Sequence, residues 1–72
     1  MNEVEVDARR LDRRMAGEIA RRALDISGGC PVIIRVEPGE PEEAVRKVAA
    51  LKKRIVIQRG SEPGCAVLEL VK

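Results

Sequence analysis

The sequence predicts an α+β two-layer sandwich, in which a four-stranded mixed sheet carries two helices on one face. Three observations support this fold class. Four short segments have the alternation or the apolar runs that are typical of strands. Two longer segments have apolar residues at spacings of three and four, as in amphipathic helices. The segments follow one another in the order β-α-β-α-β-β, and 72 residues suffice for a single domain over residues 1–72.

The first strand and the first helix are joined by an arginine-rich turn. Apolar residues alternate with acidic ones from Val4 to Ala8, which predicts a half-buried strand. Between Met15 and Leu24 the apolar residues return at helical spacing. Asp12 is the expected N-cap of this helix, because its carboxylate can accept from a free backbone N–H group. The glycine pair at 28–29 is expected to end the helix.

The second half of the chain predicts two crossover connections and a hairpin. Pro41 and the acidic residues around it are typical of a first helical turn. The expected elements are an interior strand at Val32–Val36, a helix from Glu40 with Ala44, Val45, Val48, Ala49 and Leu51 buried, and strands at Ile55–Gln58 and Cys65–Val71. Helix-length crossovers make the first three strands parallel and right-handed. A turn at residues 60–64 makes the fourth strand antiparallel.

Composition excludes several kinds of chemistry. The chain has no Phe, Tyr, Trp or His, so it offers no aromatic platform for bases, no imidazole base and no histidine metal ligand. We therefore expect no metal, no cofactor and no enzymatic activity. The net charge of +2 is too balanced to indicate nucleic-acid binding. No apolar run is long enough to span a membrane, which predicts a cytoplasmic protein. Abundant Arg, Glu and Lys are typical of thermophilic sources.

The candidate functional site is the turn between the first strand and the first helix. It carries four arginines, Arg9, Arg10, Arg13 and Arg14. A helix N-terminus also presents free backbone N–H groups, so this turn is suited to bind an anion, such as a phosphate backbone, a nucleotide or an acidic partner. The alternative is a solvated surface on which these arginines pair with Asp7, Asp12 and Glu18.

The residues Val6–Leu11, with Met15 and the segment Arg22-Ala23-Leu24, resemble the opening of the TusA/SirA-like proteins. In that family a strand ending V-D-A-R-G-L precedes C-P-x-P at the start of a helix, and the cysteine carries a persulfide. In this sequence Arg10 stands at the position of the glycine and Arg13 at that of the cysteine. The resemblance implies a TusA-like fold over nearly the whole chain. It also implies no sulfur transfer at the family site, because arginine cannot replace a thiolate.

The same order of elements is similar to that of Alba-like nucleic-acid-binding proteins and of the C-terminal domain of initiation factor 3. In Alba-like proteins a basic pair opens the first helix, as Arg13 and Arg14 do here. Their basic loop after the second strand is replaced here by the acidic segment 37–40, and their long basic hairpin by a short one at 60–64. This second resemblance implies DNA or RNA binding as an alternative function.

Two cysteines are present, and they are expected to lie too far apart to form a disulfide. Cys30 and Cys65 each precede or begin a strand, and these two strands should be antiparallel. That arrangement places the thiols at opposite ends of the sheet, about 15–20 Å apart, whereas a disulfide requires Cα atoms within about 7 Å. Cys30 in its loop is the candidate for a relocated reactive thiol in a sulfur carrier.

The sheet face without helices is a candidate interface for a homodimer or a protein partner. We expect the helices to cover Val4, Val6, Ile34, Ile55, Ile57, Ala66, Leu68 and Leu70. Alternation then places Ile33, Val56, Val67 and Val71 on the other face, with Glu5, Arg35, Gln58 and Glu69 around them. Together these features predict a non-catalytic binding or partner-interaction module.

Overall fold

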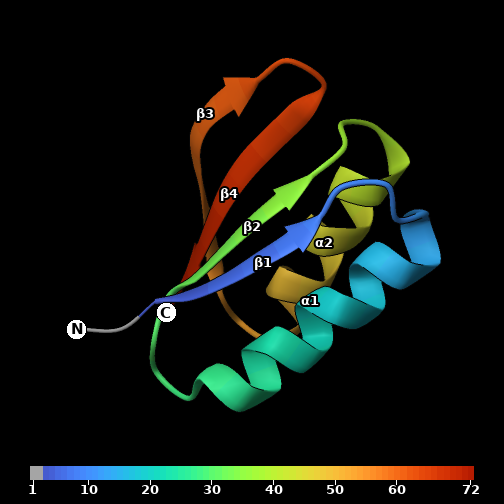
Figure 1. Ribbon diagram of the computed structural model, residues 1–72. Coiled ribbons are helices and arrows are strands. Elements are labelled where there is room, and N and C mark those ends of the chain that lie inside the picture. Colours follow the sequence, from blue (N-terminus) through green and yellow to red (C-terminus); the bar gives the residue numbers. More distant parts are fainter. Residues whose placement is uncertain (1–2) are drawn as a thin grey trace.

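The computed structural model describes residues 3–72, with the side chain of Ser61 excepted, and it has the predicted α+β architecture (Figure 1). The strands pair in the order β1-β2-β4-β3, and both helices pack on one face of this sheet. The elements are β1 (Val4–Ala8), α1 (Arg13–Ser27), β2 (Val32–Val36), α2 (Glu40–Leu51), β3 (Ile55–Glu62) and β4 (Cys65–Val71). None of the helices in the described part of the chain is long and apolar enough to cross a membrane.

Strand β4 lies in the interior of the sheet, between β2 and β3. It runs antiparallel to both, with Val32 opposite Leu70 and Val36 opposite Ala66. Strands β1 and β2 are parallel, in the register of Val4 with Val32. The first three strands therefore share one direction, as predicted, although β4 separates β3 from β2. Strands β1 and β3 form the two edges of the sheet.

The core lies between the sheet and the helices, and it is built almost entirely from aliphatic side chains. Its largest fully buried members are Ile34, Leu68, Leu70, Val32, Val36 and Val45. Helix α1 contributes mainly small residues, with Ala16, Ala20 and Ala23 buried beside Leu24. Each buried Val, Leu or Ile side chain stabilises the fold by about 1.5–3 kcal/mol. A chain without aromatic residues thus reaches a closed core by close approach of α1 to the sheet.

The ends of the helices follow the local signals in the sequence. Asp12 is the N-cap of α1, and its Oδ1 accepts from the backbone N–H of Met15 at 2.8 Å. Gly28 ends α1 with φ +63° and ψ −120°, a conformation that other residues rarely adopt. The last turns of the two helices are joined by Lys52, whose Nζ lies 2.7 Å from Oδ1 of Asp25. Arg54 donates to the carbonyl of Gly28 at 2.7 Å.

Glycine 17 lies where α1 packs against α2. A Cβ atom on Gly17 would stand 3.6 Å from Cβ of Ala44 and 3.7 Å from Cγ2 of Val48, which are ordinary contact distances. The small side chains on both helices let their backbones approach closely. This contact was not anticipated, because sequence spacing places Gly17 at the polar boundary of the helix.

The orientation predicted for β3 is wrong. Val56 stands opposite Leu70 in the ladder and packs against the core, so it faces the helices. Gln58 also faces them, because its Oε1 accepts from Arg46 of α2 at 3.3 Å. Ile55 and Ile57 instead lie on the face without helices, with 59% and 43% of their surface exposed. Three successive apolar residues show no alternation, so the sequence does not indicate which of their side chains face the helices.

Two further details differ from the sequence interpretation. Strand β3 continues to Glu62 with an irregularity between Gln58 and Gly60, so the hairpin turn is shorter than the expected 60–64. A β-bulge of this kind places an extra residue in one strand, and regular pairing resumes beyond it. Leu51, the last residue of α2, is 78% exposed instead of buried.

Candidate functional site

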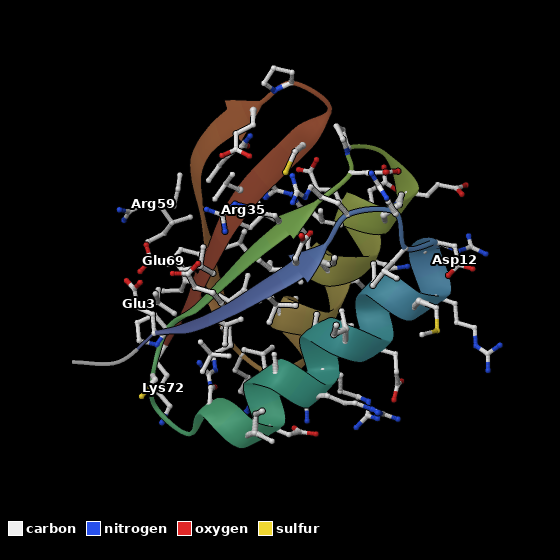
Figure 2. The ribbon with its side chains drawn as sticks, in the orientation of Figure 1. Glu3, Asp12, Arg35, Arg59, Glu69 and Lys72 are labelled. Atoms are coloured by element: carbon white, nitrogen blue, oxygen red, sulfur yellow. The ribbon has the colours of Figure 1, made fainter. Side chains whose placement is uncertain are left out.

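The arginine turn lies where the parallel strands β1 and β2 end and α1 begins. It runs from Arg9 to Arg14, and Figure 2 labels Asp12 at its centre, at the end of the molecule where α1 starts. The C-terminal ends of parallel strands and a helix N-terminus meet here. This is the region of an α/β unit in which ligands are commonly bound.

Arg9 is already occupied by an internal partner. Its Nε and Nη2 atoms donate to the two carboxylate oxygens of Asp7 at 2.9 and 2.8 Å, and its backbone N–H donates to the same carboxylate at 3.1 Å. The hydrogen bonds from Arg9 hold the pKa of Asp7 well below its usual range, and the carboxylate raises the pKa of Arg9 in return. Arg9 is therefore the member of the turn least able to accept an external anion.

Arg10 shapes the turn through its backbone. It has φ +72°, in the left-handed region that favours glycine. Its backbone N–H donates to Oε2 of Glu37 at 3.1 Å, which ties the turn to the loop after β2. A hollow of about 470 Å³ beside the turn is lined by Asp7, Arg9, Arg10, Glu37 and Gly64. Its two carboxylates offset the two guanidinium groups.

Arg13 and Arg14 are the first two residues of α1, and both are exposed. Within residues 3–72 neither forms an ion pair, and the same holds for Arg10 and Arg54; the paired arginines are Arg9, Arg21, Arg22, Arg35, Arg46 and Arg59. A small hollow of about 240 Å³ lies between Asp12, Arg13, Arg14 and Glu40. The alternative of a fully self-paired surface therefore holds for Arg9 and not for Arg13 and Arg14.

Sequence reasoning missed the part played by Glu37. In the sequence the acidic segment after β2 stands out only as a difference from Alba-like proteins, whereas Glu37 accepts from the backbone N–H of Arg10 in a contact across 27 positions. No local sequence pattern predicts a contact of this kind. It forms because β1 and β2 are neighbours and end at the same edge of the sheet.

The two thiols lie at opposite ends of the sheet, as expected, and both are free. Cys65 is buried at the start of β4. Cys30 is half-buried and follows the C-terminus of α1, so the 15 residues of this helix, about 20 Å at 1.5 Å per residue, separate it from Arg13. The described residues contain no cluster of three or more His, Cys, Asp or Glu side chains suited to hold a metal ion.

The sheet face opposite the helices, called the open face below, combines ion pairs with exposed aliphatic side chains. Arg35 lies 3.5 Å from Glu5 of β1, and Arg59 lies 2.8 Å from Glu69 of β4. Figure 2 shows Arg35, Arg59 and Glu69 on the side of the sheet away from the helices. The aliphatic residues of this face are Ile33, Ile55, Ile57, Val67 and Val71. Val56 is not among them.

Comparisons of this chain with protein-family models, with curated proteins and with solved structures found no match.

Proposed function

We propose that this protein is a non-catalytic binding module, on a TusA-like scaffold, that captures an acidic segment of a protein partner at the start of α1. The observation that carries the proposal is the pair Arg13 and Arg14, exposed at the first two helical positions and without an ion pair in residues 3–72. Cations at this position oppose the helix dipole. They do not serve the stability of α1, so an external anion accounts for them better.

Two features of the turn support the TusA-like scaffold. Arg10 has a positive φ at the position where the family motif has glycine, so the backbone there has the shape that glycine favours. Arg13 is the first residue of α1, where the family places its cysteine. A thiolate and a bound carboxylate both benefit from the N–H groups at this end of a helix. Replacing the cysteine by arginine would thus exchange covalent sulfur carriage for anion binding.

Nucleic-acid binding of the Alba type is the alternative, and a sulfur carrier using Cys30 is a second one. The hairpin offers little to a phosphate backbone, because Arg59 is held by Glu69 and Glu62 adds a negative charge. Glu37 and Glu40 lie beside the turn and would repel a phosphate backbone, whose charges continue on both sides of the site, more than a short acidic segment. For these reasons an acidic peptide is the preferred ligand.

The proposal is tested by titration with three labelled probes: a glutamate-rich peptide, a single-stranded RNA and a duplex DNA of matched charge. We expect the peptide to bind with micromolar or weaker affinity that falls as salt is added. Arg13→Ala with Arg14→Ala should abolish this binding. The control removes Arg21 and Arg22 instead, which takes the same charge from the same helix and should leave the affinity nearly unchanged.

Other outcomes would assign a different function. Tighter binding of RNA or DNA than of the peptide, with a steep loss in salt, would favour the Alba-like alternative. Accumulation of a persulfide on Cys30 after incubation with a cysteine desulfurase would favour the sulfur carrier. Equal loss of binding in the two double variants would show a diffuse charge effect and contradict the proposed site.

We further propose that the open face joins two copies of this chain. The support is the exposure of Ile55 and Ile57 on the edge strand β3, where Ile55 stands opposite Val71 of β4, so the aliphatic side chains of this face are not isolated. Arg35 and Glu69 are the polar members of this face, and each is paired within the chain, with Glu5 and Arg59 respectively.

A further inference from the structure

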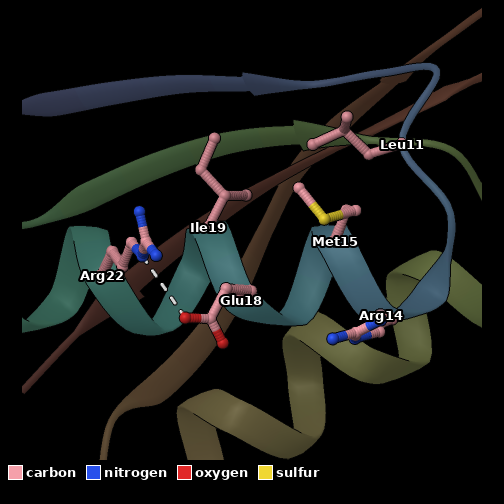
Figure 3. Close-up of a pocket in the computed structure, with 6 residues that line it drawn as sticks. All are labelled: Leu11, Arg14, Met15, Glu18, Ile19 and Arg22. Atoms are coloured by element: carbon pink, nitrogen blue, oxygen red, sulfur yellow. Dashed lines mark hydrogen bonds and ion pairs between the residues drawn. The ribbon is translucent and has the colours of Figure 1, made fainter.

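A groove runs along the flank of α1 next to β1, an edge strand of the sheet (Figure 3). It has a volume of about 520 Å³ and is lined by Leu11, Arg14, Met15, Glu18, Ile19 and Arg22. In Figure 3 Met15 and Ile19 rise from α1 towards β1, and Leu11 extends from the turn above them. Met15 is 50% exposed. An apolar stripe therefore lies open beside the free edge of a strand.

The free edge of β1 presents main-chain groups that have no partner in the sheet. The backbone N–H of Val4 donates to the carbonyl of Pro31 at 3.0 Å, which directs the main-chain groups of Val4 towards β2. Successive residues of a strand direct these groups to opposite sides. The N–H and C=O groups of Glu5 and Asp7 therefore point outward, away from β2. An extended segment could bond to them and continue the sheet.

The side chains of β1 indicate which segment would fit. Val4 and Val6 face the helices and are half-buried, whereas Glu3, Glu5 and Asp7 are exposed and acidic. Asp7 is held by Arg9, and Glu5 lies 3.5 Å from Arg35 while it remains exposed. A second β1 strand would place acidic side chains opposite these acidic ones, which is unfavourable. A segment with apolar residues at alternate positions would cover Met15 and Ile19 with one face. Basic residues of the segment, at the positions between its apolar residues, would lie beside Glu3 and Glu5.

We infer that this α1–β1 groove binds an extended peptide segment of a partner protein, of about five residues, in which apolar residues alternate with lysine or arginine. The segment adds a fifth strand at the edge of β1. The groove shares Arg14 with the anion site, but the inference goes beyond that site, because it calls for a partner segment of the opposite charge.

The probe is a capped hexapeptide of alternating valine and lysine, titrated into isotope-labelled protein while amide shifts are followed by NMR. We expect the shifts to concentrate at Glu5, Asp7 and the Met15–Arg22 stretch of α1. A peptide of the same composition in block order, with three valines before three lysines, should bind at least about fivefold more weakly, because it cannot place apolar residues on one face. Shifts confined to the open face, or none at millimolar peptide, would overturn the inference.

Two pairs of variants separate the contributions. Glu5→Pro removes an outward N–H that the sheet does not use, and it should weaken binding by about tenfold. Glu5→Gln removes only the charge and should weaken it by about twofold. Met15→Gln should weaken binding, whereas Ile26→Gln, an exposed residue of α1 outside the groove, should not. Unchanged binding in both Glu5→Pro and Met15→Gln would overturn the inference. If Glu5→Pro fails to fold, the comparison of Met15→Gln with Ile26→Gln tests the inference by itself.

Discussion

At the scale of single residues, the four arginines of the turn differ in their interaction partners. Arg9 meets Asp7 only two positions away, so little chain entropy is lost in closing their contact. Arg10 is fixed through its backbone, while its side chain lines the hollow at the end of the sheet. Arg13 and Arg14 lie on the first turn of α1, beyond the Asp12 cap. Of the four, only Arg9 therefore has a paired guanidinium group, whereas Arg13 and Arg14 are available to a partner.

Arg10→Gly should stabilise the protein by about 1 kcal/mol. The residue has φ +72°, and a side chain in the left-handed region costs roughly 1 kcal/mol that glycine avoids. The hydrogen bond from its backbone to Glu37 is kept. Urea denaturation followed by circular dichroism measures the change. The converse variant Gly28→Ala should destabilise, since Gly28 has φ +63°. A loss of stability in Arg10→Gly would mean that its side chain contributes more than the strain costs.

Stability should fall in acid because three carboxylates have lowered pKa values in the folded state. They are Asp7, held by Arg9; Glu18, held by Arg21; and Asp25, held by Lys52. Their ordinary values are 3.8, 4.5 and 3.8. A group with a lowered pKa stabilises the fold above its unfolded value and loses that effect as the pH falls through the folded one. The urea midpoint should therefore stay constant from neutral pH to about pH 5 and decline below it.

Asp7→Asn should make that acid decline shallower, because one of the three groups is removed. Glu43→Gln removes a carboxylate that has no ion pair within residues 3–72, and it serves as the control. Identical acid profiles for the two variants would contradict the part assigned to the Asp7–Arg9 pair.

Among the elements, close packing depends on small residues where α1 meets α2. Gly17 faces Ala44 and Val48 across this contact. Glycine in the middle of a helix is less favourable than alanine by about 1 kcal/mol. The structure leaves room for one methyl group at this position, at the distances of ordinary contacts.

Gly17→Ala should accordingly stabilise the protein by about 0.5–1 kcal/mol. Gly17→Ile should destabilise it, because the added atoms would force α1 away from α2. Both effects are measured by thermal unfolding. A destabilised alanine variant would mean that the two helices approach more closely than these distances indicate.

For the whole molecule, the two layers leave one side of the sheet without cover. The apolar residues of the open face include Ile33, Ile55 and Ile57, and its charged groups are largely paired within the chain. Self-association would remove these side chains from water without exposing new charges. Sedimentation velocity at tens of micromolar should therefore show a dimer.

Ile57→Lys and Ile33→Lys should each give a monomer that keeps its fold, because a charge in the centre of a small apolar interface is costly to bury. Leu51→Lys changes an exposed aliphatic residue on the helical side and should leave the dimer intact. A wild-type protein that sediments as a monomer at these concentrations would show that the open face is solvated.

The sequence by itself determined the order of elements, both ends of α1, the start of α2, the strand directions and the separation of the two thiols. These follow from local chemistry: the Asp12 cap, the glycine stop at position 28 and the periodicity of apolar residues. Tertiary structure alone decided which side of the sheet Ile55, Val56 and Ile57 face. An unbroken apolar run does not indicate this, and the register of β3 with β4 sets it. It likewise decided that Glu37 holds Arg10, since that contact joins segments that only the sheet brings together.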